Sequence, residues 1–482
     1  MKLAATGITF VALVGAAAAV TILLLREETA PKPVIALDVP AQIARPDPLR
    51  FEPGRTETYE QAAAFGLSHV LFEKSPGGIV ASAKRTARFR ALVDDATAGT
   101  GIDADVVEAI VLLESAGRQD VIAGNDPVNA AGLTQIVAGT ATDFLGMRVD
   151  LEESRRLTRL LDRATSRGDV AAADRLRSER REVDTRFDPE QALGGTVRYL
   201  TEAKNAFGRD DLAVVSYHMG IGNLSNVVRA YTARPDDPID AVVRDADIDY
   251  ARLYFDSSPG GHRASWELLA SLGDDSQTYY WRVLGALGVM RLFRTDPGRL
   301  ERLAELHDRL PSAALVLHQP EARERYADPA ELANALARGV LVDVRPVNGS
   351  RFMIDPQFLR ILAELTENPD DYLALRPRAA RFLAYVSSKV YELSGEERPL
   401  ALTRAAYDKE TAMSLTPRDP WASADADMHA TGFAFDIRRR YGSGAQAAAF
   451  QWTLERLEAL GLIAWTRGRS VIHIVVSPRA AV

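Results

Sequence analysis

Residues 101–115 read GIDADVVEAIVLLES, an apolar run at helical spacing that ends on the carboxylate Glu114. The residues that recur at three- and four-residue intervals are Ile102, Val106, Ile110 and Leu113. This spacing predicts a helix with one buried face, capped at its start by Asp103 or Asp105. Glu114 then lies at the C-terminal end among apolar neighbours, where burial and the helix dipole both raise a carboxylate pKa. A carboxyl group that keeps its proton near neutrality suits a general acid, whereas most glutamates at helix ends are only solvated.

Further motifs follow this helix in a fixed order. They are residues 132–136 (GLTQI), Asp188-Pro189, Gly195, Tyr199-Leu200 and residues 216–220 (SYHMG). Together with Glu114-Ser115 they resemble the catalytic domain of the soluble lytic transglycosylases, which is similar to goose-type lysozyme. The sequence departs from the family pattern at Thr134, where methionine is usual, and at His218, where asparagine is usual. The resemblance predicts a lysozyme-like, α-rich catalytic domain.

The resemblance also implies a reaction, cleavage of the β-1,4 bond from N-acetylmuramic acid to N-acetylglucosamine in peptidoglycan. An ordinary glycosidase uses two carboxylates, but this family is known for one. Glu114 would first protonate the leaving oxygen and then take a proton from the muramyl 6-hydroxyl, which closes a 1,6-anhydro ring without a cofactor. The residues expected to bind substrate are Ser115, Gln135, Tyr217 and His218. Asp120, Asp126 and Asp143 are conceivable second carboxylates, although loop aspartates more often form turns.

A second group of candidate residues lies near the C-terminus. His429 and Asp436 are seven residues apart in HATGFAFD, and His473 follows in VIHIVV. Residues an odd number apart on one strand face opposite sides, so a bend at Thr431-Gly432 is needed to bring the first two together. Two histidines and one aspartate suit a zinc ion with an open fourth position. The order resembles the metallopeptidase group of the D-Ala-D-Ala carboxypeptidases.

This second resemblance is incomplete at the general base. Those peptidases carry Glu three residues, or His two residues, before the last histidine, and here Ser470 and Val471 hold these places. Three interpretations stay open: a zinc site with a base from elsewhere, a peptide-binding domain with a relict site, and a packed structural motif. Arg404 matches the position of a residue that binds a substrate carboxylate or carbonyl, or it is an ordinary surface arginine.

The remaining sequence predicts how these parts are arranged. The expected segments are a membrane anchor or signal at 1–26, a Pro-rich spacer at 27–80, the lysozyme-like domain at 81–235, a helical extension at 236–345 and a peptidase-like domain at 346–482. The fold class is therefore mostly α, followed by a smaller α+β domain. The charged residues 151–184 are expected to form a solvated helical hairpin. Asn348-Gly349 predicts a β-hairpin turn.

The composition of the chain limits the compartments and the partners that we expect for it. Residues 3–25 carry no charge, which is long enough for a membrane-spanning helix. We therefore expect a periplasmic protein anchored to the inner membrane, or one exported after signal cleavage. The net charge is −8, and the sequence has no basic stripe with interleaved aromatic residues. We therefore do not expect nucleic acid as a partner. The expected partners are glycan strands and stem peptides. The alternatives are a hydrolysing muramidase, a bifunctional enzyme with zinc peptidase activity, and a non-catalytic wall-binding scaffold that recruits partners.

Overall fold

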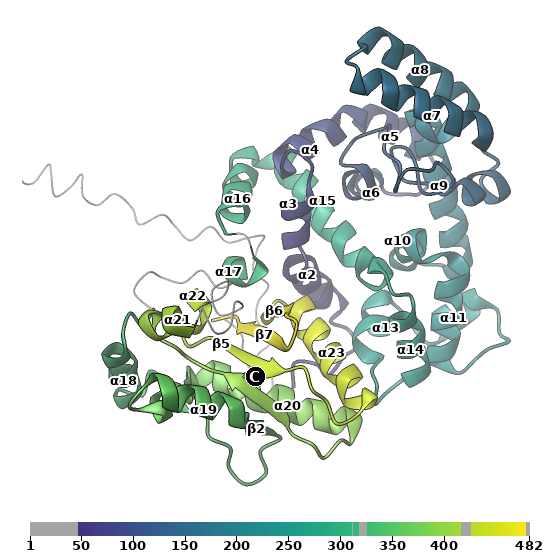
Figure 1. The fold of residues 1–482 in the computed structure, drawn as a ribbon. Coiled ribbons are helices and arrows are strands. Elements are labelled where there is room, and N and C mark those ends of the chain that lie inside the picture. The colour runs from purple at the N-terminus through teal and green to yellow at the C-terminus, as the bar shows by residue number, and fades with distance from the viewer. Residues whose placement is uncertain (1–46, 311, 318–324, 416–425, 479–482) are drawn as a thin grey trace, which may run out of the picture. The chain divides into compact units, whose positions relative to one another are not determined.

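The computed structural model describes residues 47–310, 312–317, 325–415 and 426–478 (Figure 1). The predicted anchor at 1–26 and the spacer up to residue 46 lie outside these residues. Within the described ranges, no helix combines the length and the apolarity that crossing a membrane requires. The predicted fold class is confirmed, because a long series of helices is followed by a small mixed sheet with its own helices.

The first helices run from the N-terminal end of the described chain to the predicted catalytic segment. They are α2 (Thr56–Gly66), α3 (His69–Lys74), α4 (Ile79–Thr86), α5 (Arg90–Thr97) and α6 (Ala104–Ser115). The next are α7 (Leu151–Ser166), α8 (Val170–Val183), α9 (Pro189–Phe207), α10 (Asp210–Met219) and α11 (Ile221–Thr232). Many begin where an aspartate side chain accepts from the first free backbone N–H groups, as Asp150, Asp169 and Asp188 do. Aspartate residues, some of them followed by proline, therefore determine where many of these helices begin.

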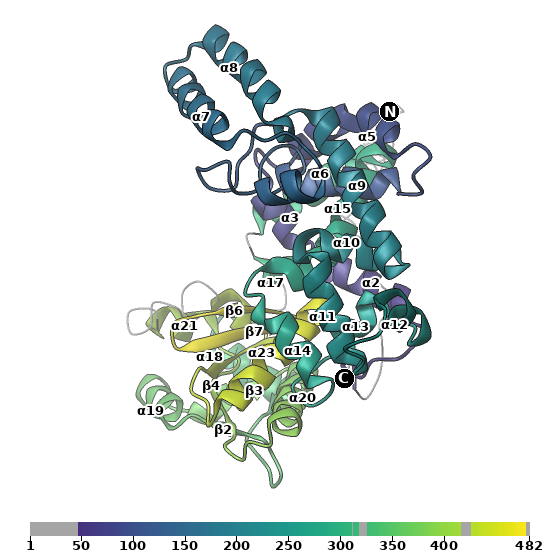
Figure 2. The same cartoon turned by 90° about the vertical axis from the view of Figure 1, so that its right-hand side faces the viewer.

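The charged segment at 151–184 forms the predicted helical hairpin. Helices α7 and α8 lie side by side in Figures 1 and 2. They bury a narrow apolar seam between them while their outer faces carry the charge. The seam consists of Leu157, Leu161, Ala164, Ala173 and Leu176.

Helix α15 (Tyr279–Thr295) is the element that completes the predicted catalytic segment. It contacts both α6 and α2. It follows α12 (Ile239–Asp245), α13 (Tyr250–Asp256) and α14 (Arg263–Ser271), and α16 (Pro297–Arg309) and α17 (Ala313–Leu317) come after it. Trp281 is fully buried and packs against the rings of Tyr250 and Tyr254. Burying such aromatic rings is a large contribution to stability, so the N-terminal turn of α15 is held firmly against the neighbouring helices.

The C-terminal part contains a five-stranded sheet in the order β2-β4-β5-β7-β6. Its strands are β2 (Phe352–Ile354), β4 (Leu400–Arg404), β5 (Ala434–Arg438), β6 (Ile463–Arg467) and β7 (Val471–Val476). Only the β2–β4 pair is parallel. The helices here are α18 (Pro329–Ala337), α19 (Pro356–Leu365), α20 (Pro377–Ser394), α21 (Lys409–Leu415), α22 (Ala426–His429) and α23 (Gly444–Ala459). Helices α20 and α23 pack on each other and on strands of this sheet.

The hairpin predicted at Asn348-Gly349 is wrong. The turn forms there, with Gly349 at a positive φ of 91°, but the strands on its two sides join different sheets. Strand β1 (Val342–Asp343) pairs with β3 (Ala374–Leu375), and β2 pairs with β4. Turn chemistry is local, whereas the choice of strand partner depends on distant residues. The domain boundaries at 80, 235 and 345 stay predictions.

Candidate active site

Glu114 lies at the end of α6, as the sequence predicted. Asp103 caps the helix by accepting from the backbone N–H of Asp105, and the left-handed Ala116 (φ 53°) ends it. The predicted buried face is wrong, because of its four residues only Ile110 is fully buried. Helix α6 is instead covered on several sides, since its buried residues also include Val107, Glu108, Ala109, Val111 and Leu112. A helix that is apolar all round is an interior helix. The spacing of its apolar residues therefore does not show which face is buried.

The carboxylate of Glu114 accepts a hydrogen bond from a tyrosine of α15. The Tyr279 hydroxyl donates to Oε1 of Glu114 at 2.7 Å. Burial raises the pKa of Glu114 to about 7, although the hydrogen bond from Tyr279 and the charge of Arg282 both lower it. Desolvation therefore outweighs the two favourable contacts. At neutral pH the group is divided between its protonated and charged forms, which suits a side chain that donates a proton and later accepts one.

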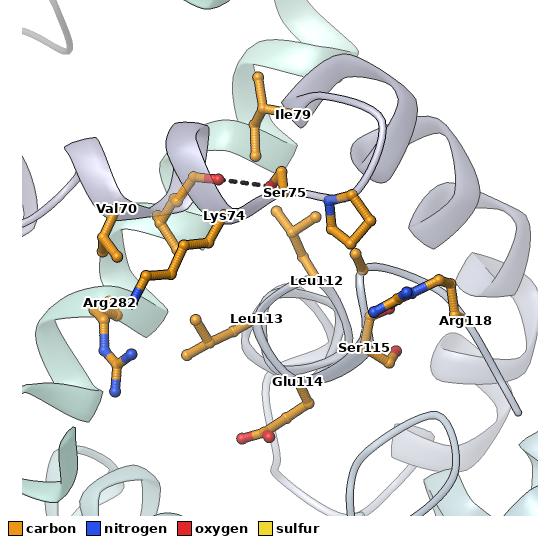
Figure 3. Close-up of a pocket in the computed structure, with 13 residues that line it drawn as sticks. Val70, Lys74, Ser75, Ile79, Leu112, Leu113, Glu114, Ser115, Arg118 and Arg282 are labelled. Carbon is orange, nitrogen blue, oxygen red and sulfur yellow. Dashed lines mark hydrogen bonds between the residues drawn. The ribbon is translucent and has the colours of Figure 1, made fainter. Parts of the chain in front are cut away.

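Glu114 opens onto a pocket of about 680 Å³ (Figure 3). Residues of α3, of the turn that follows it and of the end of α6 form the walls, and Arg282 contributes from α15. Figure 3 shows the Glu114 carboxylate and the Ser115 hydroxyl pointing in different directions from the end of α6. The walls also include Leu71, Lys74, Pro76, Leu112 and Leu113. A partly apolar pocket beside a protonatable carboxyl group can hold a sugar ring over the acid.

Tyr217 lies beside this carboxylate. Its ring stacks on Tyr279 with 6.4 Å between centroids, and its hydroxyl donates to the carbonyl of Thr134 at 2.8 Å. Burial, followed by the charge of Glu114, raises the pKa of Tyr217 well above its ordinary value. Tyr217 is thus a neutral hydrogen-bonding group. Its contact with Thr134 joins the 216–220 motif to the 132–136 motif.

His218 contacts Tyr279. Its ring stacks on the Tyr279 ring at 5.0 Å, and its Nδ1 lies 2.9 Å from the Ser276 hydroxyl. Burial lowers the pKa of His218, so the imidazole is neutral at neutral pH. These contacts add a second ring, besides that of Tyr217, that packs on Tyr279. Substrate binding by His218 stays a prediction.

The side chains of Ser115 and Gln135 form hydrogen bonds to backbone carbonyl groups of the protein. The buried Ser115 hydroxyl donates to the carbonyl of Val111 at 3.2 Å. The Gln135 amide donates to the carbonyls of Val121 and Gly132, at 3.1 and 2.9 Å. The positive φ of Gln135, 54°, is part of the same tight turn. The substrate contacts predicted for both side chains stay predictions.

The family pattern has the GLTQI motif opening a helix, but residues 132–136 form a closed turn. Ala131 and Ile136 bond each other's backbone groups across it. The next helical residues begin only at residue 138 and continue into the π-helix Thr140–Phe144. Arg186, fully buried, pairs with Asp184 and donates to the carbonyl of Ile136 at 3.1 Å. A side chain at Gly132 would come within 1.8 Å of the carbonyl oxygen of Arg186. The turn is therefore fixed by the buried Arg186 and by the close approach that Gly132, which has no side chain, allows.

Sequence reasoning did not identify Tyr279 and Arg282 as site residues. Both fall in the predicted helical extension, yet both lower the pKa of Glu114 against the effect of burial. Tyr279-Tyr280-Trp281 follow an aspartate-capped turn directly, a pattern that marks the start of a helix but not its contact with α6. The three suggested second carboxylates each have another partner. Asp120 pairs with Arg180, Asp126 pairs with Arg155, and Asp143 accepts from the Thr142 hydroxyl at 2.7 Å.

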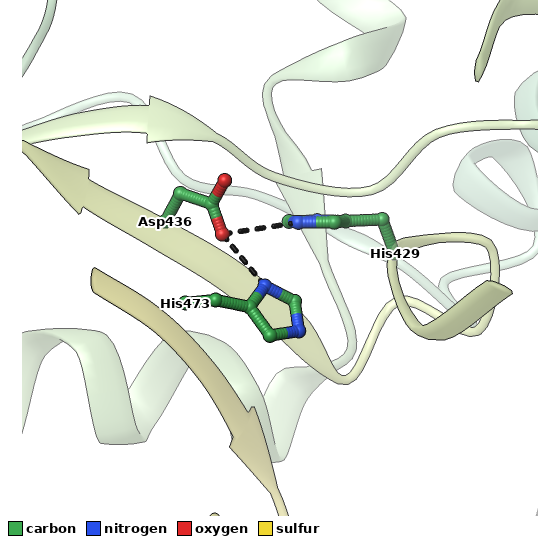
Figure 4. Close-up of side chains that lie close together, drawn as sticks. All are labelled: His429, Asp436 and His473. Atoms are coloured by element: carbon green, nitrogen blue, oxygen red, sulfur yellow. Dashed lines mark hydrogen bonds and ion pairs between the residues drawn. The ribbon is translucent and has the colours of Figure 1, made fainter. Parts of the chain in front are cut away.

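The second group of predicted residues comes together in the C-terminal sheet (Figure 4). His429 ends α22, the turn at 430–432 follows, and Asp436 lies in β5 opposite His473 in β7. Oδ1 of Asp436 lies 3.1 Å from Nε2 of His429 and 2.7 Å from Nδ1 of His473. Nη1 of Arg404 lies 3.2 Å from the other carboxylate oxygen. Burial alone would raise the pKa of Asp436, but the two histidines hold it far below its ordinary value.

The donor set of these three residues fits a zinc ion. One nitrogen from each histidine and one carboxylate oxygen lie within 4.8 Å of one another, and all three residues are buried. Zinc favours such nitrogen and oxygen donors, with a fourth position left for water or substrate. Among the described residues, no further histidine or acidic side chain joins this group. The base expected of a metallopeptidase is therefore not supplied by the cluster itself.

One family comparison bears on this chain. The model described as "Transglycosylase SLT domain" matches residues 169–239. This segment contains the motif at 216–220 and ends before α15, while Glu114 and residues 132–136 precede it. The match identifies a transglycosylase-type domain of the kind that acts on peptidoglycan. No curated protein matches the chain.

Proposed function

We propose that this chain cleaves the β-1,4 bond between N-acetylmuramic acid and N-acetylglucosamine and releases a 1,6-anhydro product. The observation that carries the proposal is Glu114, a carboxyl group in an open pocket whose pKa is raised to about 7. The SLT match supports the substrate class. A carboxyl group with this pKa can act in both directions of proton transfer near neutral pH.

In the first step Glu114 acts as the acid. Its proton passes to the glycosidic oxygen as the C1–O bond breaks, so the N-acetylglucosamine side leaves with a hydroxyl group. The muramyl sugar carries the developing positive charge at C1, and its own acetamido group stabilises that charge. Tyr279 offsets the charge left on Glu114 through its hydrogen bond to Oε1.

In the second step Glu114 acts as the base. The oxygen of the muramyl 6-hydroxyl attacks C1, and its proton returns to Glu114. The ring closes without consuming water, and the enzyme regains its starting protonation state. Tyr217 and the loop at 132–136 would hold the reacting sugar near the acid.

Two other readings predict different results. In a hydrolysing muramidase, water attacks C1 in place of the 6-hydroxyl. In a non-catalytic scaffold, neither product forms. Replacing Glu114 by Gln and measuring how fast purified sacculi are cleared separates an enzyme from a scaffold. If Glu114→Gln cleared sacculi as fast as the unaltered chain, the role of Glu114 would be refuted.

The C-terminal cluster favours a second, accessory function. We propose that His429, Asp436 and His473 hold a zinc ion, which would supply Lewis-acid chemistry on a peptide bond or carbonyl. Arg404, beside Asp436, is suited to a substrate carboxylate or carbonyl. A peptidase would need a base from elsewhere, so binding of stem peptides is the better supported role.

The proposed substrate requires a location outside the cytoplasmic membrane. We propose that the chain works in the periplasm, anchored to the inner membrane through residues 1–26 or exported after cleavage of that segment. The uncharged residues 3–25 and the Pro-rich spacer support this location.

A further inference from the structure

A pocket of about 790 Å³ opens on the C-terminal sheet, and most of its charged lining residues are cations. Four arginines face it and only one carboxylate does. The charged lining residues are Asp355, Arg360, Arg398, Arg438 and Arg440. The chain as a whole carries a net charge of −8, so the positive charge of this pocket is opposite in sign to the net charge of the chain. Like charges gathered in one concave site repel each other and attract a counter-ion or an anionic ligand.

The single carboxylate in the pocket is already used. Asp355 pairs with Nε of Arg438, and its Oδ1 accepts from the backbone N–H of Gln357 at the start of α19 at 2.8 Å. It therefore fixes Arg438 and caps a helix. Glu396, on the nearby loop, accepts from the backbone N–H of Arg398. Neither acid neutralises the guanidinium groups of Arg398 and Arg440.

Arg398 and Arg440 both line the pocket. Both are exposed, and within the described part of the chain neither has a carboxylate partner. The guanidinium group offers a planar fork of donors that matches a carboxylate, two bonds at a time. Two such groups beside a fixed Arg438 present a site for an anion with more than one oxygen.

The location of the pocket relates it to the histidine cluster. Arg438 and Asp436 are two residues apart on β5, so their side chains leave the same face of the sheet, about 7 Å apart along the strand. An extended peptide of a few residues spans that distance. The rest of the lining is Met353, Pro356, Gln357, Pro399 and Ala401, without the aromatic rings that stack on nucleic-acid bases.

We propose that this arginine pocket binds the carboxylates of an acidic peptide and thereby holds it at the end of β5 that carries Arg438. In peptidoglycan the ligand is the stem peptide, and in this respect the inference rests on the proposed function. Charge complementarity determines the ligand class, and the small apolar floor accommodates short aliphatic side chains.

The test measures binding of a fluorescently labelled stem pentapeptide to the full chain by anisotropy. We expect amidation of the peptide carboxylates to weaken binding by about tenfold or more. The double variant Arg398→Gln/Arg440→Gln is expected to lose as much for the free peptide and nothing for the amidated one. The variant Arg398→Lys/Arg440→Lys, which keeps the charge, is expected to retain most of the binding.

The matched control is Arg338→Gln/Arg469→Gln, which removes the same charge from two exposed arginines outside the pocket and should bind like the unaltered chain. Equal binding by the pocket Gln variant and the unaltered chain would overturn the proposal. So would full displacement of the peptide by inorganic phosphate at the peptide concentration. Anhydro products of the unaltered chain are measured in parallel. An unaltered chain that releases anhydro products but does not bind the peptide refutes only the pocket, and one that binds the peptide but releases no anhydro products refutes only the glycan chemistry.

Discussion

The hydroxyl of Tyr279 donates a hydrogen bond of 2.7 Å to Oε1 of Glu114, across 165 residues of sequence. This contact joins the end of α6 to the start of α15, and so ties the acid to a helix beyond the segment matched by the SLT family. The stacked rings of Tyr217 and His218 hold Tyr279 in place. The acid is thus positioned by residues that lie far apart in the chain.

Replacing Tyr279 by Phe should change the pH dependence of the reaction. The hydrogen bond lowers the pKa of Glu114 against the effect of burial, so its loss should raise that pKa further. We expect the basic limb of the kcat/KM profile to move to higher pH, and kcat to fall by about tenfold because a charge-assisted hydrogen bond is lost. Rates of product release between about pH 5 and about pH 9 would measure both effects.

Tyr280→Phe is the matched control for this variant. Tyr280 is the next residue and is also buried, but its hydroxyl donates to Glu60 at 2.7 Å. Its removal should leave the shape of the pH profile unchanged. An equal displacement of the profile in both variants would show that general loosening of α15, and not the contact with Glu114, causes the effect.

Glu114 should also make stability depend on pH. The folded chain binds this proton more tightly than the unfolded chain, with a pKa of about 7 against 4.5. The free energy of unfolding therefore falls as pH rises from about 4.5 to about 7, by roughly 1–3 kcal/mol. Glu114→Gln lacks this penalty, so we expect its Tm to exceed that of the unaltered chain at about pH 8 and to equal it at about pH 4.5. A Tm difference that is the same at both values would contradict the raised pKa.

Gly132→Ala should disrupt the 132–136 turn. The added Cβ would lie 1.8 Å from the carbonyl oxygen of Arg186 at a φ of +81°, so both the backbone and the turn must shift. We expect a loss of about 3 kcal/mol or more in urea unfolding. Gly168→Ala, at φ +70° with no atom within 4 Å, controls for the backbone strain alone and should cost about 1 kcal/mol. Equal losses in the two variants would mean that Arg186 does not constrain the turn.

The histidine cluster predicts metal binding. We expect the purified full chain to hold one zinc ion at neutral pH, and His473→Ala to hold none, measured by elemental analysis. His262→Ala, which removes a partly exposed histidine paired with Asp256, should keep the ion. Zinc-free protein with all three ligands intact would refute the site and would favour a packed structural motif.

The sequence predicted the elements of the fold better than their partners. The cap at Asp103 and the hairpin of α7 and α8 each depend on local pattern, and each forms as predicted. The strands beside Asn348-Gly349 fail as a hairpin because β2 finds its partner in β4, which lies far along the chain. The apolar residues that recur at three- and four-residue intervals in α6 do not predict its buried face, because that helix is covered on several sides.

The candidate site was predictable only where residue identity carries the chemistry. Glu114 and the His429, Asp436 and His473 group follow from residue types in a recognisable order. Tyr279 and Arg282 do not, because nothing local in α15 indicates that it reaches the end of α6. The arginine pocket is likewise invisible in sequence, since Arg398 and Arg440 meet only through the pairing of β4 with β5.

The most direct test of the central claim is the mass of the product that the full chain releases from purified peptidoglycan. We expect muropeptides one water lighter than the hydrolysis products, which is the signature of a 1,6-anhydro ring closed by the muramyl 6-hydroxyl. We also expect Glu114→Gln to release almost none of them. Products that contain the added water would show a muramidase, and anhydro products from Glu114→Gln in normal yield would contradict the role of Glu114 as acid and base.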